Sequence, residues 1–144
     1  MADRIAMNSF CKLKNKRILL VDDDEFIRDS LSLAFMKNGC FLITAKTAEE
    51  GLRILKKQGF DVIVSDLKLP GMDGLDFFEQ VKTSRLNTLN ILITAYGDKD
   101  IFSKAFAAGI HDFMEKPFTV STLTQTLGKL IENRAKRRIV SERI

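Results

Sequence analysis

Asp61-Val62-Ile63-Val64-Ser65-Asp66 is the stretch of this 144-residue chain that decides its fold. Its β-branched residues follow one another without alternating polar positions, which is typical of a parallel strand with both faces buried. Both faces of such a strand have to be covered by helices. The stretch therefore predicts an α/β protein in which Asp66 stands at the C-terminal end of a central strand.

Short apolar runs and amphipathic stretches of helical period alternate on both sides of this strand, from Lys16 onward. This alternation predicts a parallel sheet covered by helices. The expected strands are 17–21, 40–45, 61–65, 89–94 and 112–115, and the expected helices begin near 24, 48, 75, 98 and 119.

Length and composition indicate one globular domain, because 144 residues with 45% hydrophobic and 29% charged residues can bury a sizeable core. We expect a flexible arm over residues 1–15, the folded domain over 16–132, and a basic helical extension or tail over 133–144. No apolar run is long enough to span a bilayer, and the N-terminus lacks the features of a secretory signal. We therefore expect a cytoplasmic protein without a membrane partner.

The net charge of +4 is concentrated in two basic runs, at 12–17 and 134–138. We interpret the first run as part of a solvated arm and the second as cations near the C-terminal end of a helix, so we do not expect nucleic acid as a partner. Cys11 and Cys40 match neither metal nor redox spacings, and we interpret them as free thiols.

Polar side chains follow four of the predicted strands. Asp22 and Asp23 follow the first, Asp66 the third, Thr94 the fourth and Lys116 the fifth. Right-handed crossovers bring the carboxyl ends of parallel strands to the same edge of a sheet, which is where ligands of such folds bind. These five residues therefore form the candidate functional site.

Carboxylates that converge within a few Å repel one another, so either their pKa values rise or a cation neutralises them. Oxygen ligands suit Mg²⁺, which keeps several waters and shares its remaining positions with phosphate oxygens, whereas no His or Cys is present there to favour zinc. With the metal in place, Asp66 can attack phosphorus while Lys116 and Thr94 hold the transferring oxygens.

Four motifs of the chain resemble the receiver domains of two-component response regulators over about residues 16 to 132. They are Ile18-Leu-Leu-Val-Asp-Asp-Asp, Ser65-Asp-Leu-Lys-Leu-Pro-Gly-Met-Asp-Gly, Ile93-Thr-Ala and Glu115-Lys-Pro-Phe. The resemblance implies a flavodoxin-like, doubly wound parallel sheet of five strands in the order 2-1-3-4-5. Leu89 departs from the family pattern, since many members have Pro there.

The resemblance also implies a role for each acidic residue. Asp66 would be phosphorylated by a histidine-kinase phosphodonor, and Asp22 and Asp23 would form the acidic pair. The metal site would comprise Asp22, Asp23, Asp66 and the main-chain carbonyl of Lys68, with Mg²⁺ as the cofactor and Mn²⁺ as an acceptable substitute.

Further residues would complete the implied switch. Thr94 would hydrogen-bond the phosphoryl group and Lys116 would pair with it, while Phe113, at a place often held by Tyr, would follow the movement of Thr94. Ala95, Tyr96 and Pro117 would flank the phosphoryl site, and the bond between Lys116 and Pro117 would be cis. We further expect the bulk of Lys68 and Tyr96 to hinder attacking water.

By resemblance the chain is a signalling switch and not an enzyme, since it catalyses only its own phosphotransfer and autodephosphorylation. Its implied partners are a sensor histidine kinase or phosphotransfer protein, a downstream effector, and a second copy on phosphorylation. Phosphorylation would change the surface formed by the fourth helix, the fifth strand and the fifth helix of the alternation.

Three other interpretations compete with this one. A haloacid-dehalogenase-like phosphatase needs Thr or Val where Phe26 stands, and a later acidic pair that is not found. A flavodoxin-like nucleotide binder needs a Gly-rich or Ser/Thr-rich loop after the first strand, where this chain has acids. A degenerate receiver would act only as an unphosphorylated dimerisation module.

His111, the single histidine, is interpreted as a surface residue without a relay function.

Overall fold

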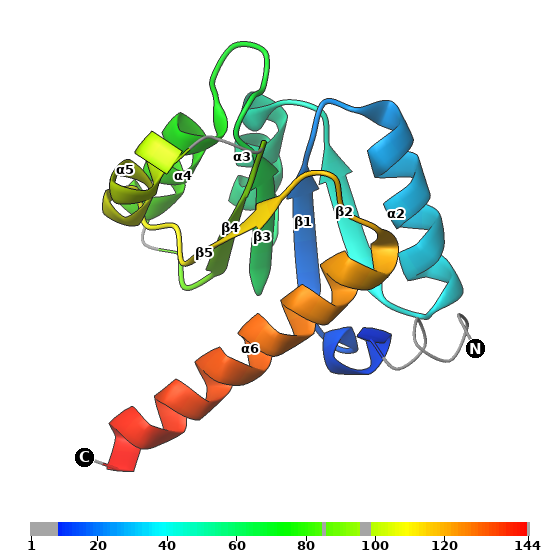
Figure 1. The fold of residues 1–144 in the computed structure, drawn as a ribbon, viewed down its shortest axis with the longest axis vertical. Helices are drawn as coiled ribbons and strands as arrows, with labels where there is room; N and C mark the ends of the chain where they lie inside the picture. The colour runs from blue at the N-terminus through cyan, green and yellow to red at the C-terminus, as the bar shows by residue number, and fades with distance from the viewer. Residues whose placement is uncertain (1–8, 85, 96–98, 144) are drawn as a thin grey trace.

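A parallel sheet with helices on both faces forms the body of the molecule (Figure 1). The structure is a computed structural model that describes residues 9–84, 86–95 and 99–143. Along the chain the elements are η1 (Cys11–Leu13), β1 (Arg17–Val21), α2 (Glu25–Lys37), β2 (Phe41–Ala45), α3 (Ala48–Lys57), β3 (Val62–Asp66), α4 (Gly74–Thr83), β4 (Leu89–Thr94), η2 (Lys99–Ile101), α5 (Phe102–Ala107), β5 (Asp112–Glu115) and α6 (Val120–Arg143). None of the helices described here is both long and apolar enough to cross a bilayer.

The strand order is β2-β1-β3-β4-β5, and every neighbouring pair is parallel. This confirms the predicted order 2-1-3-4-5. Strand β3 lies in the middle of the sheet, and all of its residues are buried, as expected from its uninterrupted apolar run. In the register between β3 and β1, Val21 pairs with Ser65. The next residues, Asp22 and Asp66, therefore lie side by side at the C-terminal ends of the two strands.

Two hydrophobic cores lie on opposite faces of the sheet, because successive side chains of a strand point to opposite sides. In β1, Leu19 and Val21 contribute to the core under α3, α4 and α5. Ile18 and Leu20 contribute to the core under α2 and α6. Figure 1 shows α6 crossing the sheet on this second side.

Helices α2, α3 and α6 begin at side-chain caps. The Asp24 carboxylate accepts hydrogen bonds from the first-turn amides of α2, and the Thr47 hydroxyl accepts one from Glu50 at the start of α3. The Glu50 carboxylate reaches back to the amide of Lys46, one residue before the cap. Thr119 accepts from the amide of Thr122 at the start of α6. Helix α6 continues to Arg143, so the expected basic extension is helical over the residues described.

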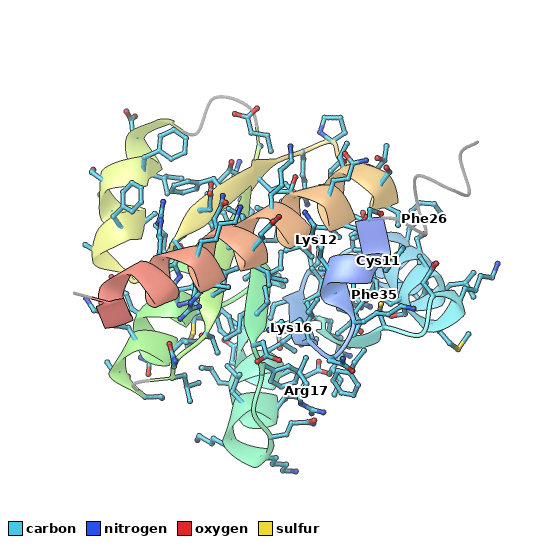
Figure 2. The ribbon with its side chains drawn as sticks, turned by 90° about the horizontal axis from the view of Figure 1, so that it is seen from below. Cys11, Lys12, Lys16, Arg17, Phe26 and Phe35 are labelled. Carbon is cyan, nitrogen blue, oxygen red and sulfur yellow. The ribbon has the colours of Figure 1, made fainter. Side chains whose placement is uncertain are left out.

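Residues 9–13 differ from the flexible arm expected over 1–15. Phe10 is only 1% exposed and packs edge-on against Phe35 of α2, with ring centroids 5.1 Å apart, and Leu13 is fully buried. The Thr124 hydroxyl donates to Ser9 Oγ at 2.6 Å, and Lys12 pairs with Glu132. Figure 2 shows this short segment beside α6. Two apolar residues within a basic stretch are too few to show a period, which is why the sequence pattern does not reveal this packing.

Gly74, the first residue of α4, lies against the main chain that carries Asp66. A Cβ atom at this position would be 2.3 Å from the Asp66 carbonyl oxygen and 2.9 Å from Leu92 Cδ1. The Gly74 amide also donates to the Leu67 carbonyl at 2.8 Å. The absence of a side chain thus allows α4 to begin directly beside the end of β3.

Phe10→Ala is expected to lower the free energy of unfolding by about 3–5 kcal/mol, because the substitution leaves a cavity between α2 and α6. Urea denaturation followed by circular dichroism measures this loss. Phe26→Ala is the matched control, because Phe26 is 79% exposed and its removal should change stability by less than about 0.5 kcal/mol. Equal losses in the two variants would contradict the packing of residues 9–13.

Gly74→Ala is expected to destabilise the fold by about 1–3 kcal/mol, because the added methyl group meets main-chain atoms that cannot turn away. Thermal unfolding by calorimetry measures the effect. Gly59→Ala serves as the control, since a Cβ there meets no atom within 4 Å. If both variants unfold at the wild-type temperature, the close approach of α4 to β3 is not a constraint.

Candidate functional site

Three carboxylates meet at the C-terminal edge of the sheet. One oxygen each from Asp22, Asp23 and Asp66 lie within 4.8 Å of one another. Asp22 and Asp66 are buried, whereas Asp23 is exposed. The parallel register of β1 and β3 causes this convergence, because it aligns the ends of the two strands. The structure therefore brings together the three acidic residues that the sequence predicts.

Asp22 is the most deeply placed of the three, with an exposed fraction of 0%. Its Oδ1 accepts a hydrogen bond from the Asp24 amide at 3.0 Å, while its buried Oδ2 has no hydrogen-bond partner among the residues described. Burial raises the pKa of this carboxyl, and the Asp24 amide and Lys116 oppose the shift. A buried anionic oxygen without a donor is suited to a cation ligand.

Lys116 is the counter-charge of the cluster. Its ammonium donates to Asp66 Oδ2 at 2.5 Å and lies 3.8 Å from Asp22 Oδ2. Burial acts to lower the Lys116 pKa. The hydrogen bond that Lys116 donates to Asp66 and the negative charges of Asp22, Asp66 and Asp23 outweigh this effect, so the pKa is raised. The ammonium is therefore charged and directed at the candidate nucleophile.

The main chain holds Lys116 at this edge. Its amide donates to the Thr94 carbonyl at 2.9 Å, which continues the pairing of β4 with β5. The peptide bond between Lys116 and Pro117 is cis, as predicted. The end of β5 is thus anchored to the end of β4.

Thr94 ends β4 next to Ile93, the residue that pairs with Asp66, and is buried. Its place at the C-terminal edge brings it to the same end of the sheet as the carboxylates.

Lys68, an exposed loop residue, donates a hydrogen bond from its main-chain amide to Asp66 Oδ1 at 3.3 Å. Ala95 is exposed directly after β4, while Tyr96 lies outside the residues described.

Phe113 of β5 lies in an aromatic cluster with two residues of α5. Its ring centroid lies 4.4 Å from that of Phe102 and 5.9 Å from that of Phe106, and both ring pairs are edge-on. Phe106 is 63% exposed, so the cluster reaches the surface. Phe77 and Phe78, in contrast, are fully buried in the core under α4.

His111 does not belong to the site. It precedes β5, at the opposite end of the strands from the carboxylates, and it is exposed as expected. Its Nδ1 nevertheless accepts a hydrogen bond from the Asn90 amide at 2.9 Å. Burial of part of the ring lowers the His111 pKa, and the charge of Arg134 adds to this effect. The side chain thus continues the hydrogen bonding between β4 and β5.

Two supporting residues are absent from the predicted site. The Arg28 guanidinium donates to the Asp22 carbonyl at 2.8 Å and ties α2 to the end of β1. Gly74 allows α4 to approach the Asp66 main chain. Arg28 shows no distinguishing sequence signal, because arginines are common in helices. The two glycines near the loop after β3 signal a turn but not the close approach.

A sequence model of the response regulator receiver domain matches residues 18–128, which is more than half of the chain. The matched range lies inside the domain expected over 16–132 and includes all the carboxylates described above. It also includes Thr94 and Lys116.

Curated relatives are similar over most of the chain. Sporulation initiation phosphotransferase F of Bacillus subtilis is 31% identical over 119 residues, which are 83% of this chain and 96% of that protein. The transcriptional regulatory protein GlrR of Escherichia coli is 31% identical over 122 residues, or 85% of this chain. This chain spans only 28% of the length of GlrR.

Solved structures show the same fold. A CheY-like receiver domain protein from Methanospirillum hungatei matches with a TM-score of 0.77 and 30% identity, covering 85% of this chain and 98% of that one. The chemotaxis response regulator CheY4 of Vibrio cholerae matches with a TM-score of 0.74 and 30% identity, covering 80% and 98%. Fold, carboxylate cluster and sequence agree, and the chain belongs to the family of response regulator receiver domains, the signalling switches of two-component systems.

Proposed function

We propose that Asp66 accepts a phosphoryl group from the phosphohistidine of a sensor kinase or phosphotransfer protein, in a reaction that requires Mg²⁺. The observation that carries this proposal is the short contact between Lys116 Nζ and Asp66 Oδ2, 2.5 Å, within a cluster of three carboxylates. A carboxylate oxygen of Asp66 attacks phosphorus, and the bond from phosphorus to the donor nitrogen breaks. We also propose a cytoplasmic location, where the chain would meet the phosphohistidine of its donor.

The carboxylate cluster fits a divalent cation. Its oxygens lie within 4.8 Å of one another, and the buried Asp22 Oδ2 lacks a hydrogen-bond donor among the residues described. Asp22, Asp23 and Asp66 would hold Mg²⁺, or Mn²⁺ in its place, together with the Lys68 main-chain carbonyl. When bound, the ion supplies positive charge that offsets the repulsion among the carboxylates and the incoming phosphoryl oxygens.

Lys116 and Thr94 would then hold the transferred group. The Lys116 ammonium already touches Asp66 and needs only a small movement to pair with a phosphoryl oxygen. Thr94 stands at the end of the neighbouring strand and offers a hydroxyl donor. Phosphorylation adds a charge of about −1.5 to −2, which attracts both groups toward Asp66.

The aromatic cluster offers a route from the site to the surface. Phe113 lies on β5 between the phosphoryl site and the exposed rings of Phe102 and Phe106 on α5. A change at Thr94 would repack these rings and alter the surface of α5, β5 and α6. A downstream effector, or a second phosphorylated copy, would recognise this altered surface.

Incubation with acetyl phosphate and Mg²⁺ is expected to add the mass of one HPO₃ group to the wild-type chain. The adduct should be labile to hydroxylamine, as an acyl phosphate is, and absent in EDTA. Asp66→Asn preserves the size of the side chain and should abolish the adduct, whereas Asp76→Asn, on an exposed helical position, should retain it. Intact-mass spectrometry measures all four samples.

A wild-type chain that remains unmodified under every condition would contradict the proposal and indicate a receiver that signals without phosphorylation. An adduct that persists in Asp66→Asn would instead assign the phosphoryl group to another residue.

Asp22→Asn is expected to raise the free energy of unfolding at pH 7 without metal, by about 1–3 kcal/mol, because it removes a buried charge with an unpartnered oxygen. The folded-state pKa of Asp22 lies above its unfolded value of 3.8, so its contribution favours folding at low pH and is lost as pH rises through the folded pKa. The gain from Asp22→Asn should therefore shrink as pH is lowered toward 4.

Urea unfolding at several pH values, with and without Mg²⁺, measures both effects. Asp23→Asn is the matched control, because Asp23 is exposed: it should weaken stabilisation by Mg²⁺ without raising the metal-free stability. An Asp22→Asn variant that is no more stable than Asp23→Asn in EDTA would show that the buried charge costs nothing.

A further inference from the structure

The structure brings the chain's two cysteines to the same place. Cys11 begins η1, and Cys40 lies between the end of α2 and the start of β2. The Cys40 Sγ is 3.7 Å from the carbonyl oxygen of Phe10, whose carbonyl carbon is bonded to the amide nitrogen of Cys11. The thiol of Cys40 thus contacts the main chain directly next to Cys11, although the two residues are distant in sequence.

The position of Cys11 is fixed by the packing around it. Phe10 is locked against Phe35, and Lys12 is paired with Glu132 of α6 at 2.6 Å. The aliphatic part of Lys12 also lies against Gly128, where a Cβ would be 3.2 Å from Lys12 Cδ. Figure 2 shows Cys11 on the short segment between α6 and Phe35. The packing of Phe10 and Lys12 therefore holds Cys11 near Cys40.

The two thiols differ in accessibility. Cys11 is exposed, whereas Cys40 is partly buried. Burial raises the pKa of the Cys40 thiol, Lys14 opposes this shift, and Cys11 adds to it. The influence of Cys11 on Cys40 is consistent with their proximity. An exposed thiol is open to oxidants, while a sheltered thiol beside it is suited to react in a second step.

We propose that Cys11 and Cys40 form a reversible intramolecular disulfide when the protein meets a peroxide. The Cys11 thiolate attacks one peroxide oxygen, so that an S–O bond forms, the O–O bond breaks and one water leaves after protonation. The Cys40 sulfur then attacks the Cys11 sulfur, so that the S–S bond forms and the hydroxyl leaves as a second water. Two thiols are oxidised and one hydrogen peroxide is reduced to two waters.

The disulfide would join the N-terminal segment to the end of α2 and the start of β2. Both cysteines precede strands β1 and β2, so they lie at the sheet edge opposite the carboxylate cluster. Oxidation would consequently stabilise the packing of residues 9–13 without touching the phosphoacceptor residues. The disulfide does not depend on the proposed phosphotransfer.

The test treats the reduced 144-residue chain with a small excess of hydrogen peroxide at low protein concentration. Intact mass should show the loss of two hydrogen atoms, and non-reducing peptide mapping should link Cys11 to Cys40. Dithiothreitol should restore the starting mass. Cys11→Ser and Cys40→Ser should each abolish the loss.

Three outcomes would overturn the proposal: only oxygen addition at Cys11, disulfide-linked dimers in place of the internal link, or an unchanged mass. Thermal unfolding adds a second readout. The oxidised wild type should melt at a higher temperature than the reduced form, because the link restricts the unfolded chain, while peroxide should leave the melting of both Ser variants unchanged. A lower melting temperature would show that the native structure does not accommodate the bond.

Discussion

Electrostatic repulsion among Asp22, Asp23 and Asp66 is the constraint on which the rest of this structure depends. The parallel register of β1 and β3 forces the acids together, and the burial of Asp22 prevents water from screening its charge. Lys116 offsets the repulsion only in part, because its ammonium hydrogen-bonds Asp66 while standing 3.8 Å from Asp22. The remaining negative charge at the site consequently favours the binding of a cation.

Much of the scaffold serves to keep this unfavourable arrangement in place. Arg28 ties the carbonyl of Asp22 to α2, and the amide of Lys68 holds one oxygen of Asp66. Gly74 allows α4 to begin against the Asp66 main chain, where any side chain would intrude. These contacts come from three separate elements, so the geometry of the carboxylates is set by the folded domain as a whole.

The sequence predicts the features that depend on local chemistry or on strand order. The uninterrupted apolar run at 62–64 predicts a central strand, and the polar residues at strand ends predict a shared site because parallel strands end together. Capping by Asp24 and Thr47 follows from side-chain type and position. The packing of Phe10 and Leu13 was not predictable in this way, since it depends on a partner surface formed by α2 and α6. The contact from Arg28 and the meeting of Cys11 with Cys40 are likewise tertiary, and sequence spacing does not encode them.

Helix α6 gives the domain a mechanical property of its own. Leu123 and Leu127 are buried in the core beneath it, Leu130 and Ile131 pack against this core, and the Arg134 guanidinium donates to Asn87 Oδ1 at 2.6 Å. The helix continues beyond these contacts to Arg143. The nine residues after Arg134 correspond to about 14 Å at 1.5 Å per residue. A tilt of about 5° of the anchored part would displace the far end of the helix by about 1 Å. Small rearrangements of the anchored part would therefore be enlarged toward Arg143, at the far end of the helix.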